Sequence, residues 1–132
     1  MYSTVYDRVE LLAAPLDTSL YTAIAGENYQ SLVQVQNTNI LVGNILENYY
    51  YSSNSTSHIV TSILFDVQAS WMTFSTQYLQ IEELPIIVNS EGYTVIDDEM
   101  GNPCLFSISW DKNGIKNFAT EVTNRLLNWN KN

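Results

Sequence analysis

The stretch of sequence that decides the fold is LFSISWDKNGIKNFATEVTNRLLNW, residues 105–129. Residues 105–110 indicate a strand that is rich in apolar and aromatic side chains. Either Asp111 or Asn113 can then open a helix. Apolar residues follow at steps of three and four, at Ile115, Phe118, Ala119, Val122, Leu126 and Trp129. This spacing predicts an amphipathic C-terminal helix over 113–129 with its apolar face buried.

Two further strands are predicted just before this stretch. They are residues 86–88 and 93–96, and they flank the turn 89–92, whose glycine can take a positive φ. The loop 97–103 leads from the second of them to the strand 105–110. Pro85 is expected to end whatever element precedes it. These strands predict a small antiparallel sheet on which helices pack.

Two central segments each fit more than one structure. Over residues 29–50, a helical stripe competes with a hairpin, and we favour the helix. That stripe consists of Leu32, Val35, Asn39, Val42, Leu46 and Tyr49. Over residues 59–81 a helix is again favoured because the segment holds neither Gly nor Pro, and a long twisted hairpin is the alternative. Its stripe consists of Ile59, Ile63, Val67, Trp71, Phe74, Tyr78 and Ile81.

Short helices are expected at the start of the chain, over residues 5–14 and 17–25. Pro15 ends the first, Asp17 or Thr18 caps the second, and Gly26 would supply its left-handed C-terminal residue. With the elements above, the prediction is an α+β fold. Residues 1–132 fit a single globular domain, because the length is typical of one domain and neither repeats nor long linkers interrupt it.

The charge of the chain restricts its partners. The net charge is −9, from 14 acidic and 5 basic residues, and no Lys or Arg occurs between Val9 and Asp111. Several cations are needed to displace the counterions of a phosphate backbone, so nucleic acid is disfavoured as a partner. An anionic membrane surface is disfavoured for the same reason. Uncharged polar residues and tyrosines replace the missing charges, and such a surface suits contacts with proteins.

The usual components of a catalytic site are scarce. His58 is the only histidine, and its surroundings in the sequence offer neither a nucleophile nor an orienting carboxylate. Cys104 is the only cysteine, so no intrachain disulfide forms, and we interpret it as a structural thiol. Residues 97–99, Asp-Asp-Glu, suit a solvated turn, with calcium binding as the alternative. We therefore expect no enzymatic activity and no cofactor.

Aromatic residues provide the candidate interface. Trp71, Trp110 and Trp129 lie on apolar stripes and are expected in the core. Tyr49, Tyr50 and Tyr51 differ, because three consecutive rings cannot all face one side of a helix or strand. A polar, turn-rich segment follows them up to residue 57. We interpret residues 49–57 as an exposed loop whose tyrosines contact another protein chain.

The pattern as a whole favours a non-enzymatic structural or assembly subunit, most of all a component of a phage or viral particle. Its partners would be protein chains, in a homo-oligomer or a larger assembly. The alternative is a small acidic inhibitor or immunity-type protein that binds a basic partner. No secretion signal and no membrane-spanning run is visible, so a cytoplasmic location or one inside an assembled particle is expected.

Overall fold

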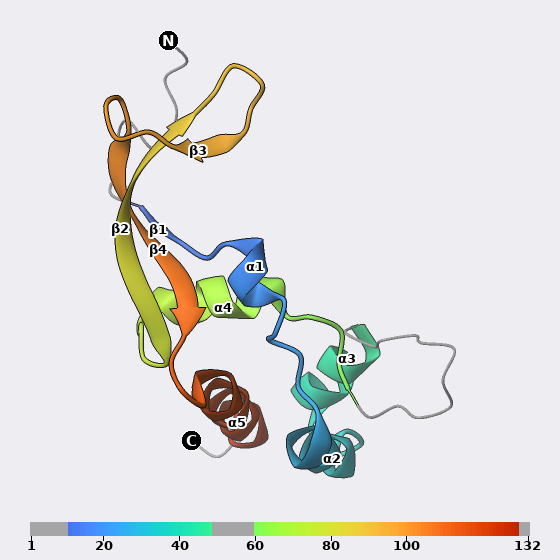
Figure 1. Ribbon diagram of the computed structural model, residues 1–132. Helices are drawn as coiled ribbons and strands as arrows, with labels where there is room; N and C mark the ends of the chain where they lie inside the picture. Colours follow the sequence, from blue (N-terminus) through green and yellow to red (C-terminus); the bar gives the residue numbers. More distant parts are fainter. Residues whose placement is uncertain (1–10, 49–59, 130–132) are drawn as a thin grey trace.

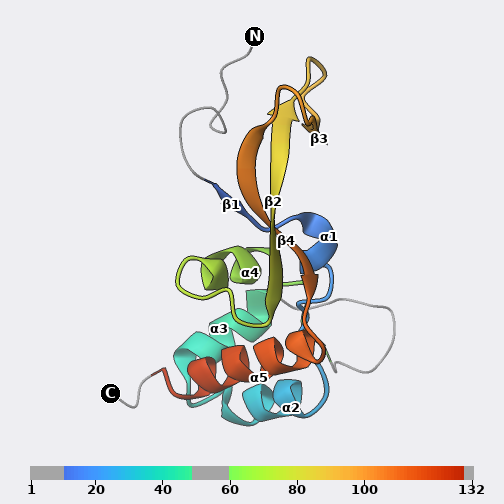
Figure 2. The same cartoon turned by 60° about the vertical axis from the view of Figure 1, so that its left-hand side comes forward.

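A computed structural model describes residues 11–48 and 60–129 of the chain. Within these ranges the fold is α+β, as the sequence predicts, with five helices and a four-stranded sheet. The helices gather at one end of the molecule, and the sheet extends past them at the other end (Figures 1 and 2). The chain therefore has a helical base and a projecting β-structure.

The sheet has the strand order β1-β4-β2-β3. Strands β2 (Leu79–Val88), β3 (Thr94–Ile96) and β4 (Asn102–Trp110) pair antiparallel, as predicted. The short β1 (Leu12–Ala13) pairs parallel to β4, which makes the sheet mixed. The described part of the predicted helix 5–14 is not helical, since residues 12–13 form β1, and residues 5–10 lie outside the described ranges. The cause is tertiary, because the Leu105 N–H donates to the carbonyl of Leu11 at 2.9 Å.

Pro85 does not end an element; it lies inside β2, opposite Pro103 of β4. The carbonyl oxygen of Pro85 accepts a hydrogen bond from the Asp97 N–H at 2.9 Å, so its backbone faces β3 and not β4. The two prolines thus form a pair of the type that exchanges no hydrogen bonds. Neither proline removes a bond between β2 and β4, and this is why the strand continues through Pro85.

The turn between β2 and β3 forms as predicted. The Asn89 N–H donates to the Tyr93 carbonyl at 2.9 Å, and Gly92 has a φ of +88°. The side-chain Oδ1 of Asn89 accepts from the N–H groups of Glu91 and Tyr93, each at 3.0 Å. A side chain that bonds its own turn holds the hairpin's register.

Residues 29–50 are helical in the described part, up to Asn48, but in two pieces. They are α2 (Gly26–Val35) and α3 (Ile40–Asn48). The predicted stripe is correct in that Leu32 and Val42 are both fully buried. Asn39 separates the helices: its Oδ1 accepts from the Val42 N–H and its Nδ2 donates to the Leu126 carbonyl, both at 3.2 Å. This asparagine caps α3 and ties the break to the C-terminal helix.

The single helix expected over 59–81 is wrong. The helical part is α4 (Phe65–Met72), and the chain then turns into β2 at Leu79. The indole Nε1 of Trp71 donates to the Gln77 carbonyl at 3.2 Å and Tyr78 has a φ of +77°, so the chain folds back over Trp71. Because β2 must meet β4, pairing in the sheet overrides the helical stripe.

The helix expected over 17–25 is shorter and earlier than predicted. It is the single turn α1 (Leu16–Ser19); the chain turns at residues 20–21 and then runs without helix to Ala25, which is extended and bridges to Val60. Thr61 holds that segment, because its Oγ1 accepts from the Ile24 N–H at 2.9 Å and its own N–H donates to the Ile24 carbonyl at 3.0 Å. Gly26 does take a positive φ of +59°, but it begins α2 and does not end a helix.

The C-terminal helix is present as α5 (Gly114–Leu127). Phe118 is 1% exposed and stacks edge-on against Trp71, with ring centroids 5.4 Å apart. Trp71 and the partly buried Trp110 occupy the core as expected, but Trp129 is 62% exposed. The helix ends before Trp129, which therefore leaves the buried stripe. The main core joins the helices to the lower end of the sheet; its buried members are Ile24, Tyr29, Leu32, Val42, Leu46, Leu64, Trp71, Met72, Leu79, Phe118 and Val122.

Candidate interaction surface

The predicted tyrosine interface cannot be placed. Tyr49, Tyr50 and Tyr51, together with the remainder of the loop to residue 57, lie outside the described residues. The same holds for His58. The interpretation of Tyr49–Tyr51 as contact residues therefore stays a prediction.

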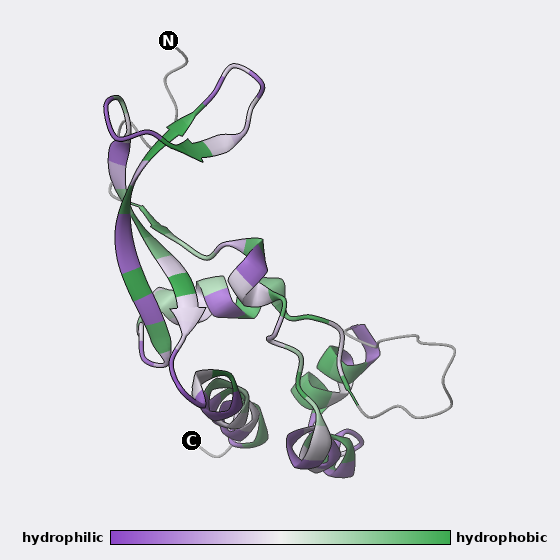
Figure 3. Ribbon diagram, viewed as in Figure 1, coloured by the Kyte–Doolittle hydropathy of each residue, from purple (hydrophilic) through white to green (hydrophobic). Residues whose placement is uncertain are grey.

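The most prominent feature of the described surface is the end of the sheet that the helices leave uncovered. We call residues 82–105 the hairpin arm; it comprises most of β2, all of β3, the beginning of β4 and the connecting turns. Figures 1 and 2 both place it beyond the helices. Figure 3 shows hydrophobic and hydrophilic residues side by side along it. Its exposed side chains are free to meet another molecule.

Large apolar side chains are exposed on the hairpin arm. Tyr93 is 66% exposed, Ile96 61% and Met100 60%. Aromatic residues and methionine are enriched where proteins meet. These three residues do not stand out in the sequence, because each belongs to a strand or loop whose exposed face is set by the tertiary fold. Two of the predicted elements, 93–96 and 97–103, nevertheless contain them.

The hairpin arm is also the most acidic part of the described chain, and it contains no Lys or Arg. Its acidic residues are Glu82, Glu83, Glu91, Asp97, Asp98 and Glu99. All are exposed except Asp97, which is half-buried. The exposed apolar side chains and the acids together give this end of the molecule both contact area and a negative field.

Asp97 organises the loop for which calcium binding was the alternative. Its Oδ1 accepts from the N–H groups of Glu99 at 3.0 Å and Met100 at 2.9 Å. Its carbonyl oxygen accepts from the Gly101 N–H at 2.8 Å. In residues 11–48 and 60–129, no three His, Cys, Asp or Glu side chains converge as a metal site would require. The bonds of Asp97 are those of a self-capped turn.

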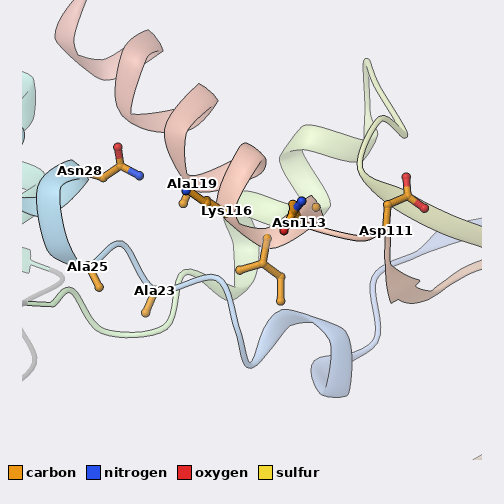
Figure 4. A pocket seen from close by; sticks show the side chains of 9 residues that line it. Ala23, Ala25, Asn28, Asp111, Asn113, Lys116 and Ala119 are labelled. Carbon is orange, nitrogen blue, oxygen red and sulfur yellow. The ribbon is translucent and has the colours of Figure 1, made fainter.

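A groove lies at the opposite end of the molecule, where the extended segment before α2 passes the start of α5 (Figure 4). We call it the α5 groove; it is open and has a volume of about 400 Å³. Ala23 and Ala25 line one side, and Lys116 and Ala119 of α5 lie across from them. The remaining lining residues are Asn28, Asp111, Asn113, Gly114 and Ile115. Five of these nine residues are small or apolar, and the other four are two asparagines, one carboxylate (Asp111) and one ammonium group (Lys116).

The described interior holds one polar cluster that the sequence analysis did not anticipate. Gln68 of α4 is fully buried, and its Nε2 donates to Thr18 Oγ1 at 3.0 Å and to Ser107 Oγ at 2.9 Å. Thr18 donates in turn to the Pro15 carbonyl at 2.9 Å. The Gln68 Oε1 has no hydrogen-bond partner among the described residues. The cluster joins α1, α4 and β4, and its hydroxyls are engaged by backbone carbonyls rather than poised for chemistry.

Cys104 lies in β4 and is 1% exposed, in agreement with its interpretation as a structural thiol. Burial raises the pKa of the thiol, and the nearby Glu83 carboxylate raises that pKa further. A thiol whose anion is disfavoured is a weak nucleophile at neutral pH.

Comparison with protein families, curated proteins and solved structures finds no match for this chain. Among the described residues, none of the helices combines the length and apolar character that crossing a bilayer requires.

Proposed function

We propose that this chain is a non-enzymatic structural or assembly subunit that works through contacts with other protein chains. The observation that carries the proposal is the hairpin arm, with Tyr93, Ile96 and Met100 exposed beyond the helices. Burying three such side chains in a contact would contribute several kcal/mol, at about 1.5–3 kcal/mol for each fully buried side chain. A phage or viral particle is the setting that we propose for such an assembly.

The low charge of the chain supports this proposal. Charged residues make up 14% of the chain, and 9 tyrosines provide amphipathic contact area. Uncharged polar groups cost less to desolvate than charges, so this composition favours ordered protein contacts. The weak nucleophilicity of the buried Cys104 agrees with a non-enzymatic role. We expect Cys104→Ala and His58→Ala, made separately, to leave assembly intact.

The test replaces the exposed apolar side chains of the hairpin arm together, as Tyr93→Ser, Ile96→Ser and Met100→Ser. Association of the purified chain, and its incorporation into purified particles, should fall while the melting temperature stays nearly unchanged. Ile40→Ser is the matched control, because Ile40 is 76% exposed on α3, away from the hairpin arm. An arm variant that associates and incorporates as well as the control would refute the role of the arm.

The predicted tyrosine contact has a separate test. If residues 49–51 are contact residues, Tyr50→Ser with Tyr51→Ser should weaken association and leave the fold and melting temperature nearly unchanged. A destabilised protein would instead mean that these rings cover the domain's own core, and would count against the interface. Both thermal stability and association must therefore be measured on the same double variant.

A second function is favoured by the acids of the hairpin arm, namely that of a small inhibitor or immunity-type protein that binds a basic partner. Six carboxylates without a neighbouring cation would attract such a partner and speed its encounter. Salt separates the two functions. Capture that depends on charge weakens steeply between low and high salt, whereas a contact through Tyr93, Ile96 and Met100 persists.

A further inference from the structure

Strand β2 lacks a neighbouring strand along part of one side. β4 pairs with most of β2, whereas β3 pairs with its other side only at Ile86–Val88. The last bond on that side joins the Asp97 N–H to the Pro85 carbonyl. Below it, no described strand pairs with residues 81–84 on this side, and Figure 1 shows β2 at the margin of the molecule. We call residues 81–84 the open edge.

The backbone of the open edge presents unpaired hydrogen-bonding groups. Successive residues of a strand direct their N–H and C=O groups to alternate sides. Pro85 directs its carbonyl towards β3, so Glu83 and Ile81, at every second position before it, face the same side. Neither residue has a backbone hydrogen bond to a described residue on that side. Their N–H and C=O groups can therefore bond a further strand, as when a peptide adds to the edge of a sheet.

The side chains of the open edge select the kind of strand that can bind. Ile81 and Leu84 are half-buried, and the two residues between them, Glu82 and Glu83, are exposed. Consecutive side chains of a strand point to opposite faces, so one carboxylate lies on each face of the sheet. Neither carboxylate forms an ion pair with a described residue. An incoming strand therefore meets two acids, one on each face, between apolar neighbours.

The surrounding charge has a single sign. The hairpin arm holds six acidic residues and no Lys or Arg. The described cations are Lys112, Lys116 and Arg125, all within or just before α5. Directly opposed side chains of neighbouring strands stabilise the pair when their charges differ and destabilise it when they are alike. Two adjacent basic residues are therefore the side chains that fit opposite Glu82 and Glu83.

This chain cannot supply such a strand to a second copy of itself. No two of its five basic residues are adjacent in the sequence. Antiparallel pairing of two open edges would place Glu82 of one copy opposite Glu83 of the other, and two like charges would repel. The occupant therefore comes from a different protein.

We propose that the open edge binds an extended segment of a partner protein in which two adjacent Lys or Arg residues lie between apolar residues. The segment runs antiparallel to β2, as β3 and β4 do, because such pairing is slightly more stable than parallel pairing. Glu83 and Ile81 each exchange two backbone hydrogen bonds with the residue opposite. This inference rests on the proposed contact with other protein chains and names the chemistry of one partner.

The probe is a synthetic peptide with blocked ends, TVKKVT, added to the full unmodified chain. In antiparallel register its lysines lie opposite Glu83 and Glu82, and its valines lie opposite Leu84 and Ile81. TVEEVT is the charge control. TVKKVT should bind roughly tenfold or more tightly than TVEEVT, because both opposed pairs change from attraction to repulsion. Isothermal titration calorimetry measures both affinities.

Two N-methylated forms of TVKKVT separate strand addition from attraction of charge alone, since both keep the charge. In one, the methyl group replaces the N–H that bonds the Glu83 carbonyl, on the lysine opposite Glu83. In the other, it is on the lysine opposite Glu82, whose N–H points away from β2. The first form should bind roughly tenfold more weakly than TVKKVT, and the second should bind nearly as well.

Amide exchange followed by nuclear magnetic resonance locates the contact. In the free protein, the N–H groups of Ile81 and Glu83 should exchange with deuterium faster than those of Glu82 and Leu84, which face β4. TVKKVT should slow the exchange of Ile81 and Glu83, and TVEEVT should not.

A charge variant of the protein completes the design. Glu82→Lys with Glu83→Lys should reverse the preference, so that TVEEVT binds more tightly than TVKKVT. Glu47→Lys with Asp66→Lys has the same charge change at exposed positions of α3 and α4 and should keep the preference of the unmodified protein. Circular dichroism must show equal folding for both variants.

Three results would overturn the inference. They are equal affinity for TVKKVT and TVEEVT, the absence of binding included; equal affinities of the two methylated peptides; and protection of the Ile81 and Glu83 amides in the free protein. None of them touches the test of the proposed function, which measures incorporation of the Tyr93→Ser, Ile96→Ser and Met100→Ser variant into particles. The two failures are therefore distinguishable.

Discussion

Gln68 is the residue whose environment is least expected from its type. A fully buried amide is costly unless its polar atoms are bonded, and its Oε1 has no partner among the described residues. Both Nε2 hydrogens are used, on Thr18 and Ser107, so the amide links α4 to α1 and β4. Gln68 contributes to specificity of packing at some cost in stability.

This position allows a comparison of two substitutions. Gln68→Ala leaves a cavity and should destabilise the protein by roughly 2–5 kcal/mol, the usual range for large-to-small core changes. Gln68→Leu keeps most of the volume and removes the unbonded oxygen, while Thr18 still donates to Pro15. It should cost clearly less than Gln68→Ala in urea unfolding. Equal losses for the two variants would mean that hydrogen bonding, and not volume, dominates at this site.

Cys104 predicts a pH dependence of stability. Its pKa is raised above the ordinary value of 9.0 by burial, and then by Glu83. Above pH 9 the unfolded chain loses the thiol proton while the folded chain keeps it, so the free energy of unfolding falls as pH rises. Below pH 9 this contribution is fully present.

The measurement compares the unmodified protein with Cys104→Ala by urea unfolding from pH 7 to pH 10.5. Tyrosine ionisation affects both proteins equally, so the difference between them isolates the thiol. The stability gap should be constant below pH 9 and should shrink above it. Parallel profiles over the whole range would contradict the raised pKa.

Among the helices and strands, we expect α5 to contribute most to the stability of the helical base. Phe118 contacts Trp71 and Trp110 at centroid distances of 5.4 and 5.1 Å. Phe118→Ala should therefore cost about 3–5 kcal/mol in chemical denaturation. Ile115→Ala, at a half-buried position of the same helix, is a control that should cost less. If Phe118→Ala left the midpoint of chemical denaturation unchanged, the Phe118 ring would not be part of the core and the assignment of α5 to it would be wrong.

Strand β2 has an open edge along its lower half. Leu105 directs its N–H to Leu11, so the opposite residue, Glu83, points its backbone away from β4. β3 covers only Ile86–Val88 of that side. Charged side chains on an edge discourage pairing with other strands, and Glu82 and Glu83 have this position.

Replacing these two charges should therefore allow the edge of β2 to pair with strands of other molecules. We expect Glu82→Thr with Glu83→Val to increase irreversible aggregation on heating, because an edge of β-branched, uncharged residues pairs readily. Light scattering during a thermal ramp measures it, with Glu27→Thr and Glu47→Val on the helices as the control. Aggregation no greater than that of the control would show that this edge is covered by other means.

At the scale of the whole molecule, the helical base and the hairpin arm differ in the packing that stabilises them. The main core joins the helices to the lower sheet and includes no residue of the arm, whose buried Ile86 and Cys104 lie outside that cluster. Amides of β3 and of the upper β2 should exchange with deuterium earlier than those of α5, because they open without disrupting that core. Mass spectrometry of peptides from the two regions measures this. Equal protection would mean that the molecule opens as one unit.

Local patterns in the sequence determine a substantial part of this protein. The helix at 114–127, the turn at 89–92 and the strand at 105–110 follow from spacing and turn chemistry, which act over a few residues. The poverty in basic residues is also a property of the sequence alone. From it come the expectation of protein partners and the expectation that nucleic acid is not one of them.

Tertiary structure alone decided the rest, because contacts between distant residues choose among structures that are locally similar. The break between α2 and α3 depends on Asn39, which reaches Leu126, and β1 exists because Leu105 donates to Leu11. The stripe over 59–81 gave way to a strand for the same reason, since β2 had to pair with β4. The α5 groove consists of residues that only the folded chain brings together, from the segment before α2 and from α5, and the exposure of the contiguous hairpin arm depends on where the helices pack. Hydrophobic periodicity shows which face of a helix or strand is buried, but the element that packs against this face is determined by the fold of the whole chain.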